Sequence, residues 1–407
     1  MPLTAEPSPA PARHGPLHGL HVLDLSTVIS GPMAVAILAD QGAAVIKVET
    51  PEGDTCRSIG PAKGDLSAMY IAVNRGKRSL ALNLKSAAAR PILTALLKRA
   101  DVVVHNFRPG VMARLGLADA ALVAINPKLI RLEISGHGPD GPGAGDKVYD
   151  AVIQAEAGVG ASHRDQHTGQ PGLVATLLVD KLTALTAAQA ATAALLARER
   201  DGQGRRVEVS MLDATLAFQW PDAMYNHVFL DAPPAPFPEL GATQKPWPTR
   251  DGFAATMTPQ QSEFKALCTA LGQPQIADDP RFGSNRLRNI NAAVLRNTLA
   301  PLIAGFSNDE LQAACRLHGA PMGRVNERQA VVDAPQVRHN QALVEIAHGD
   351  IGRVRLARAA ARFDGAALTN PGPAAHVGEH GAAVLAELGF DAAQVARWVA
   401  EKAVSLG

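Results

Sequence analysis

The stretch HVLDLSTVISGPMAVAILAD, residues 21–40, decides the fold class of this chain. Its first part, 21–26, is an apolar run typical of a buried strand. Gly31 and Pro32 follow, and an apolar stretch then continues to Leu38. Proline is tolerated near the start of a helix, where its missing N–H would have no partner anyway. The segment therefore predicts a strand that leads directly into a helix.

The same alternation continues along the first third of the chain. Further strands are predicted at 43–49, 101–106 and 128–135, with a helix at about 87–99. The strand DVVVHN has a continuous apolar centre, as strands covered on both faces have. Strands of this kind that alternate with helices predict an α/β fold built on a parallel sheet.

Composition changes along the rest of the chain. Residues 173–200 are rich in Ala and Leu and contain no Gly or Pro, which predicts one long helix. Prolines crowd the stretch 232–250 and indicate a linker or irregular loop. Residues 251–330 resemble a separate small α+β unit, and two amphipathic helices are predicted at 382–388 and 391–404.

Overall composition excludes several classes of protein. The chain has 407 residues, of which 47% are hydrophobic, so wholesale disorder is excluded. Its 39 basic and 38 acidic residues leave a net charge of +1, so no broad surface for nucleic acid or anionic lipid is expected. The most apolar run, 182–197, is too short and too polar to span a bilayer easily.

Targeting and redox signals are weak. The first 18 residues are rich in Pro and Ala without an apolar core, so we expect a disordered tail rather than a secretory signal. The cysteines Cys56, Cys268 and Cys315 are far apart and form no CxxC pair, which argues against a disulfide framework. We expect a cytoplasmic protein.

Two sequence motifs occur here without the surrounding residues that their usual functions require. GHGPDG at 136–141 matches GxGxxG, but a dinucleotide fingerprint needs a helix to begin there, and Pro139 and Pro142 interrupt it. His376 and His380 have the spacing of zinc ligands, yet HVGEH lacks the Glu that follows the first His in a zinc protease. We therefore predict no metal site.

Asp180 is the most informative single residue. It lies in the apolar helical stretch GLVATLLVDKLTAL, where a buried carboxylate costs several kcal/mol unless it is paired or serves chemistry. Desolvation would raise its pKa and make its anion more reactive toward an electrophile. The alternative is a structural ion pair, although adjacent Lys181 would not face it on a helix.

Three further segments are candidates for ligand binding. Asn106 and Phe107 follow a strand end, where ligands gather in open α/β sheets, although a Pro-Gly turn also explains them. NRGKR at 74–78 places three cations in a predicted loop and suits phosphates, unless it is simply a solvated charge run. Lys147 and Tyr149 would share one face of an extended segment, or belong to a plain surface loop.

Taken together, these segments resemble the class III CoA-transferases, a family that includes formyl-CoA transferase and carnitine CoA-transferase. The related α-methylacyl-CoA racemases share its fold. The likeness covers nearly all of the chain from about residue 19. It is carried by GLHVLDLSTVISGP, NRGKRSLALNL, ADVVVHNFRPGVMARLGL, KVYDAVIQAEAG, LLVDKLTAL, GQGRRVEVSMLDA and DDPRFGSNRLRN.

The resemblance implies an interlocked homodimer. It also implies a discontinuous, Rossmann-like large domain and a smaller α+β domain. The expected segments are a tail at 1–18, the N-terminal part of the large domain at 19–205, a linker at 206–224, the small domain at 225–330, and a linker with the C-terminal part of the large domain at 331–407.

Roles for individual residues also follow from the resemblance. Asp180 matches the catalytic aspartate of the family. CoA contacts are implied for Asn106, Phe107, Arg114, Lys147 and Tyr149, and by weaker matches for Arg57, Arg75 and Lys77. No permanently bound cofactor is implied, since acyl-CoA is a substrate and its partner is a carboxylic acid. The proline-rich FPELGATQKPWP replaces a glycine-rich lid, so we expect an acceptor larger than oxalate or formate, such as a branched or C4–C5 dicarboxylic acid.

The implied reaction moves CoA from an acyl-CoA donor to a carboxylic acid through aspartyl anhydride and aspartyl-CoA thioester intermediates. A racemase is the first alternative. Its histidine would fall in the segment KVYDAV, where this chain has Tyr149, and His137 lies a dozen residues earlier. A non-catalytic CoA-binding protein is the second alternative, and the desolvated charge of Asp180 argues against it.

Overall fold

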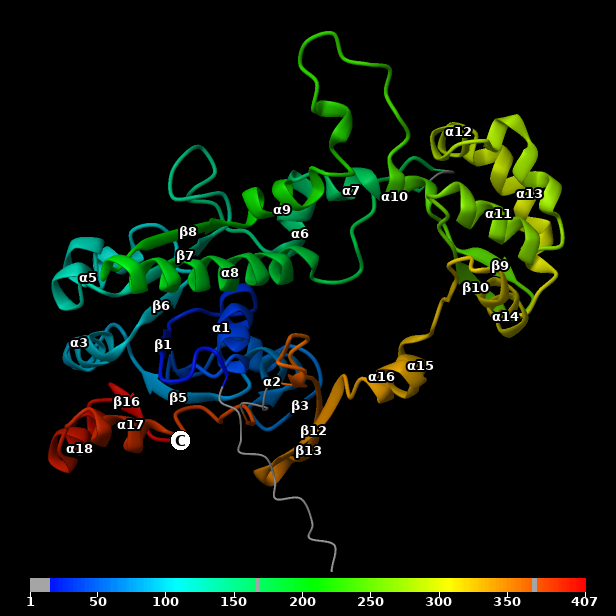
Figure 1. Cartoon of the computed structure of the whole chain (residues 1–407). Helices are drawn as coiled ribbons and strands as arrows, with labels where there is room; N and C mark the ends of the chain where they lie inside the picture. The colour runs from blue at the N-terminus through cyan, green and yellow to red at the C-terminus, as the bar shows by residue number, and fades with distance from the viewer. Residues whose placement is uncertain (1–14, 166–167, 368–371) are drawn as a thin grey trace, which may run out of the picture. The chain divides into compact units, whose positions relative to one another are not determined.

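The computed structural model describes residues 15–165, 168–367 and 372–407 (Figure 1). These residues form two compact units. Unit 1 consists of the described residues up to Ala157 together with Val174–Leu216 and Asn340–Gly407, and unit 2 consists of Gly158–Leu173 and Ala217–His339. The segment 225–330, expected as the small domain, lies within unit 2.

A seven-stranded sheet forms the centre of unit 1, with strand order β16-β5-β2-β1-β6-β7-β8. Every neighbouring pair is parallel except β16 with β5. The strands are β1 (His21–Asp24), β2 (Ala44–Glu49), β5 (Lys77–Leu82), β6 (Val102–His105), β7 (Ile130–Ser135), β8 (Arg206–Ser210) and β16 (Val404–Ser405). The predicted α/β fold with a largely parallel sheet is confirmed.

Helices cover both faces of this sheet because its strand residues alternate between two cores. Val22 and Val104 belong to one core, whereas Leu23 and Val103 belong to the other. The first core is completed by α1 (Ser30–Asp40), α6 (Asp150–Glu156) and α8 (Leu178–Asp201). The second is completed by α3 (Ala89–Arg99), α4 (Val111–Arg114), α5 (Asp119–Ile125), α17 (Gly381–Glu387) and α18 (Ala392–Ala400).

Several predicted boundaries need correction. The predicted loop at 74–78 is wrong, because α2 (Ala68–Asn74) ends at its first residue and β5 begins at Lys77. The long helix starts at Leu178 rather than at 173. The amide side chain of Gln154 bonds the N–H of Val174 and the carbonyl of Thr176, which holds that stretch out of the helix. No helix begins within the GxGxxG segment, as expected.

The ordered part of the chain begins within the predicted N-terminal tail, which was expected to extend to residue 18. Leu17 is buried in the first core, and its N–H donates to the carbonyl of Gln41 at 2.9 Å. Gly15 lies so close to Gln41 that a Cβ there would be 2.1 Å from the same oxygen. The apolar Leu17 and the small Gly15 therefore fix this segment. Residues 1–14 of the predicted tail lie outside the described residues.

The rest of unit 1 consists of short elements. Three small hairpins are formed by β3 (Ala62–Lys63) with β4 (Leu66–Ser67), β12 (Leu343–His348) with β13 (Gly352–Ala357), and β14 (Arg362–Phe363) with β15 (Ala366–Ala367). The 3-10 helices η1 (Thr55–Ser58) and η5 (Gly349–Ile351) accompany them.

Unit 2 has its own core around a three-stranded sheet. The sheet consists of β9 (Trp247–Thr249), β10 (Gly252–Ala255) and β11 (Gly323–Arg324). Its helices include α7 (Val159–Ser162), α10 (Leu240–Thr243), α11 (Gln261–Ala270), α12 (Asn285–Ile290), α13 (Ala292–Ala304), α14 (Asn308–His318), α15 (Arg328–Asp333) and α16 (Pro335–His339), and α9 (Met211–Gln219) crosses from unit 1. Among the described residues, no helix is both long and apolar enough to cross a membrane.

Candidate active site

A pocket of about 260 Å³ lies in unit 1 beside the carboxyl ends of β1, β6 and β7. The strand order reverses between β1 and β6, which is where open α/β sheets bind their ligands. Five of the residues selected from the sequence line this pocket: Asn106, Phe107, Lys147, Tyr149 and Asp180. The fold therefore brings together segments that are up to 74 residues apart in the chain, and the pocket is the candidate active site.

Asp180 is the third residue of α8 and is buried. Its own N–H donates to the carboxylate of Asp150 at 3.1 Å, so Asp150 caps the helix end beside it. Burial, and to a smaller extent the negative charge of Asp150, raise the pKa of Asp180 from its ordinary 3.8 to about 6, although a hydrogen bond from Ser30 opposes both effects. The carboxylate is thus poorly stabilised, as the carboxylate of a nucleophile should be.

The structural alternative for Asp180 was an ion pair. Among residues 15–165, 168–367 and 372–407, no cation lies within ion-pair distance of its carboxylate. Lys181, the nearest cation in sequence, instead donates to the hydroxyl of Thr176 at 2.6 Å. The burial of Asp180 therefore has no structural compensation of the kind that ion pairs provide.

Asn106 and Phe107 follow β6 directly, but their side chains are partly committed to the protein. The amide of Asn106 accepts from the N–H of Thr27 at 2.9 Å and donates to its carbonyl at 2.8 Å. It therefore ties the loop after β6 to the loop after β1. The ring of Phe107 stacks on His105, with the ring centres 5.6 Å apart. Both residues define the shape of the pocket at this edge of the sheet.

The cations and the phenol around the pocket are exposed. Lys147 and Tyr149 lie just before α6, and 68% of Tyr149 is accessible to solvent. Arg114 is exposed at the end of α4 and does not line the pocket. Arg108 lines it but was not selected from the sequence, although its place three residues after a strand end was a usable signal.

Val28, also in the pocket wall, has a strained backbone that the sequence did not reveal. Its φ of 69° is unusual for a β-branched residue. Its N–H donates to both carboxylate oxygens of Asp54, at 3.1 and 3.3 Å, and Asp54 pairs with the fully buried Lys47 at 2.9 Å. Strained residues that the surrounding structure holds in place are typical of functional sites.

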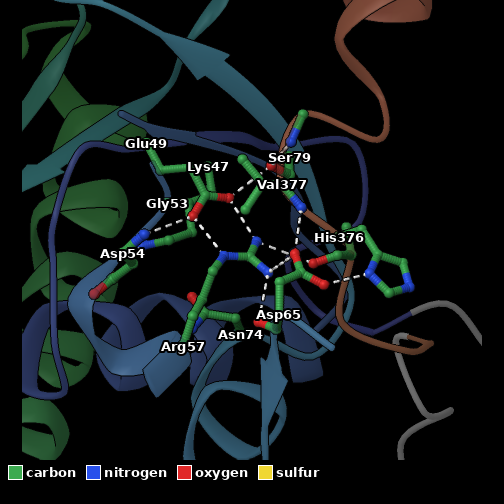
Figure 2. Close-up of polar contacts among 12 residues, drawn as sticks. Lys47, Glu49, Gly53, Asp54, Arg57, Asp65, Asn74, Ser79, His376 and Val377 are labelled. Carbon is green, nitrogen blue, oxygen red and sulfur yellow. Dashed lines mark hydrogen bonds and ion pairs between the residues drawn. The ribbon is translucent and has the colours of Figure 1, made fainter. Parts of the chain in front are cut away.

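Arg57 does not line this pocket, and its expected contact with CoA stays a prediction. Its side chain is 6% exposed and makes two hydrogen bonds to Glu49, at 2.9 and 2.7 Å, and one to Asp65 at 2.9 Å. A further bond joins it to the carbonyl of Ala375. Figure 2 shows the guanidinium enclosed by these groups. We therefore assign Arg57 to a buried network that connects β2 to the C-terminal segment.

Lys77 and Arg75 are also committed to internal carboxylates. The ammonium of Lys77 is buried and lies 2.7 Å from Asp24, and the guanidinium of Arg75 pairs with Asp40. Neither residue lines the pocket. The basic cluster predicted to meet phosphates is thus divided, because β5 carries Lys77 into the sheet.

One group of side chains in the described residues has the chemistry of metal ligands: His348, Asp350 and His376, whose ligand atoms lie within 4.8 Å of one another. Both ring nitrogens of His376 already have partners, Asp65 at 2.5 Å and Asp350 at 3.2 Å. Burial lowers the pKa of His376, but these two hydrogen bonds more than offset it and raise the pKa. The arrangement favours a proton rather than a metal ion at this imidazole.

Comparison with known proteins identifies the family of this chain. The model of CoA-transferase family III matches residues 17–381. The chain belongs to this family. A succinate–glutarate CoA-transferase of Agrobacterium fabrum is 34% identical over 93% of this chain and 97% of its own. An acetyl-CoA:oxalate CoA-transferase of Acetobacter aceti is 35% identical over 84% of this chain and 88% of its own.

Two solved structures share the fold. Rv3272 of Mycobacterium tuberculosis is similar with a TM-score of 0.80 and 31% identity, covering 91% of this chain and 99% of that one. A CAIB/BAIF family protein from Brucella suis gives a TM-score of 0.78 with 31% identity, over 92% and 100%. The likeness thus extends over both units.

Proposed function

We propose that this chain transfers CoA from an acyl-CoA donor to a carboxylic acid, with Asp180 as the nucleophile. The observation that carries the proposal is a buried carboxylate without an ion-pair partner, in a pocket at the reversal of strand order. Membership of CoA-transferase family III supports it.

The reaction proceeds through covalent intermediates on Asp180. Its carboxylate attacks the thioester carbonyl of the donor, the C–S bond breaks, and a mixed anhydride and CoA thiolate result. The thiolate attacks the aspartyl carbonyl, which releases the donor as a carboxylate and leaves an aspartyl-CoA thioester. The acceptor carboxylate attacks this thioester, the C–S bond breaks, and a second anhydride and CoA thiolate result. The thiolate then attacks the acceptor carbonyl, and Asp180 leaves as a free carboxylate.

The environment of Asp180 suits these steps. A partly desolvated carboxylate is a stronger nucleophile toward a thioester than a hydrated one. The raised pKa reports that desolvation, yet at about 6 it still leaves the group mostly ionised at neutral pH. Each intermediate conserves the energy of the thioester only while water is excluded, and burial of Asp180 provides that protection.

The pocket favours transfer over racemisation. Exchange of an α-proton by a pair of bases would need a second base near Asp180, such as the histidine of the racemases. No histidine lines this pocket among the described residues, and Tyr149 is present instead. His137 is held elsewhere by Glu156 at 2.6 Å and by the carbonyl of Gly143 at 3.0 Å.

We further propose a C4–C5 dicarboxylate as one of the two acids. Relatives named for succinate and glutarate include the protein of Agrobacterium fabrum and succinyl-CoA:glutarate CoA-transferases of mouse and human, at 30% and 29% identity. The proline-rich stretch at 237–248 also differs from the glycine-rich lid of formyl-CoA transferase. The interlocked homodimer of the family is part of the same proposal.

Trapping of the intermediate tests this function. The chain is incubated with succinyl-CoA, glutaryl-CoA, acetyl-CoA or oxalyl-CoA, quenched with hydroxylamine and mapped by peptide mass spectrometry. We expect a hydroxamate at Asp180, formed most readily with the C4–C5 donors. Asp180 unmodified by every donor, together with exchange of the α-proton of 2-methylacyl-CoA in deuterated water, would instead establish the racemase reaction.

The ionisation of Asp180 predicts a pH profile. The initial rate of hydroxamate formation should rise with pH around a midpoint of about 6, because only the anion attacks. In Asp150→Asn the midpoint should fall, since a nearby negative charge is removed while an oxygen remains to accept from the N–H of Asp180. Asp146→Asn, at an exposed carboxylate of the same pocket, should shift it less. A midpoint that is unchanged or higher in Asp150→Asn contradicts this account.

Lys147 is the exposed cation best placed to meet a CoA phosphate. Lys147→Met should raise the KM for acyl-CoA about fivefold, as expected for one solvent-exposed charge contact, and should change kcat little. Steady-state kinetics measure both constants. Lys128→Met, which removes an exposed lysine outside the pocket, is the matched control. Equal KM values for the two variants would exclude Lys147 from CoA binding.

A further inference from the structure

Unit 2 contains a second cavity, of about 360 Å³. Three cationic residues line it, Lys245, Arg288 and Arg296, and no carboxylate does. Its lining also includes two aromatic residues, Trp247 and Phe264. A concave site with an apolar lining and a few convergent charged groups is the usual form of a ligand site.

Arg288 carries a buried charge without a counter-ion. The residue is 4% exposed, and its hydrogen bonds go only to uncharged groups, the amide oxygen of Gln261 and backbone carbonyls. No ion pair of Arg288 is found among the described residues, and its guanidinium lies over the ring of Phe264 at 4.7 Å. Burial lowers the pKa of Arg288, and no carboxylate opposes that shift. The four hydrogen bonds offset part of the cost of burying this charge, but they do not neutralise it.

Arg296 adds a second fixed positive charge. Its guanidinium lies 4.7 Å from the ring centre of Trp247 and donates to the carbonyls of Lys245 and Pro246, at 3.2 and 2.7 Å. In the part of the chain that the structure describes, neither Arg296 nor Lys245 has an ion pair. The stacked ring and the carbonyls hold the guanidinium in place but leave its charge unneutralised. The cavity therefore has a positive potential.

Apolar side chains supply the rest of the recognition surface. Leu267, Leu295 and Leu299 line the cavity together with the two aromatic rings. A small hydrophilic anion would leave this surface uncovered. Four bonds from the terminal nitrogens of Arg288 already go to the protein, so direct hydrogen bonds to an anion come from Arg296 and Lys245, fewer donors than a phosphate requires. A single carboxylate on an apolar body matches both the charge and the lining.

We propose that this cavity binds an organic carboxylate with an apolar acyl or aryl body. The residues that line the cavity all belong to unit 2. This site does not rest on the proposed transfer reaction. Experiments can therefore disprove the carboxylate site without disproving CoA transfer, and the reverse.

Titration of the full chain with octanoate, followed by tryptophan emission, tests the site. We expect a saturable change that is lost in Trp247→Phe, where Trp220 and Trp398 still emit. Lys245→Met should raise the Kd about fivefold or more, because it removes a charge from the rim. Arg316→Met, which removes an exposed charge of unit 2 outside the cavity, should leave the Kd unchanged.

The comparison ligands make the outcome decisive. Succinate, inorganic phosphate and 3′,5′-ADP should bind more weakly than octanoate, and Asp180→Asn should bind octanoate as the parent chain does. An emission change that persists in Trp247→Phe overturns the proposal, as does an equal loss in Lys245→Met and Arg316→Met. Binding of phosphate or 3′,5′-ADP as tight as that of octanoate also overturns it, in favour of a phosphate site. Thermal unfolding of each variant shows that the substitutions leave the fold intact.

Discussion

Asp180→Ala is expected to lower CoA-transfer turnover by roughly 10⁴-fold or more, the size seen when a covalent nucleophile is removed. The affinity for acyl-CoA should change little, because the carboxylate attacks the thioester rather than holding the nucleotide. Steady-state kinetics give turnover, and equilibrium binding of a non-hydrolysable acyl-CoA thioether gives affinity. The separation of the two effects identifies a catalytic rather than a binding role.

Two further variants sharpen this experiment. Asp146→Ala removes an exposed carboxylate from the same pocket and should retain most of the turnover. If it abolishes turnover as Asp180→Ala does, general disturbance of the pocket rather than loss of a nucleophile is responsible. If Asp180→Ala retains turnover, the covalent mechanism is wrong. If it loses affinity and turnover together, Asp180 is a binding residue.

Asp180→Asn adds a test that is independent of activity. The pKa of Asp180 in the folded chain, about 6, exceeds its ordinary value of 3.8, so folding favours the protonated group. The stability that this group contributes is fully present below about pH 4 and is lost as pH rises through about 6. The variant should therefore be more stable than the parent at pH 8, by an amount on the order of 2 kcal/mol, with little difference at pH 4. Denaturant unfolding at both pH values measures it.

Asp180 shows what the sequence predicts well. A carboxylate between apolar neighbours on a helix can be recognised from the sequence. The apolar pattern predicts that the carboxylate is buried, and burial of its charge costs free energy. The segment after β6 was found in the same way, because strand ends are recognisable and gather at one edge of a parallel sheet. The strands themselves were predicted to within two residues where they are apolar, as β2 and β7 are.

The errors at the basic cluster have one physical origin, which is that charged residues were assumed to be exposed. β5 begins with Lys77, and three cations within 74–78 indicate a loop unless their carboxylate partners are known. The partner of Lys77 is Asp24, which is 53 residues away, so no local pattern reveals the pair. The strain at Val28 was equally hidden, because it depends on a hydrogen bond to Asp54 from another segment.

Arg57→Met is expected to destabilise the fold by about 3–5 kcal/mol, the usual cost of removing one partner from a buried ion pair. The variant would leave the carboxylate of Glu49 without its two hydrogen bonds from the guanidinium, and Asp65 would keep only its contact with His376 as an ion pair. It would also release the carbonyl of Ala375, which links the C-terminal segment to the sheet. Denaturant unfolding gives the change in free energy, and acyl-CoA binding is measured on the same samples.

Arg78→Met is the matched control for this experiment. Arg78 pairs with Glu387 at the surface, where 34% and 54% of the two side chains are exposed. Loss of such a pair should cost about 1 kcal/mol or less. A large loss of stability in Arg57→Met alone, with acyl-CoA affinity retained by the folded fraction, assigns Arg57 to the buried network. Unchanged stability with weakened acyl-CoA binding would restore it to the CoA site, and the guanidinium would then have to leave Glu49 when CoA binds.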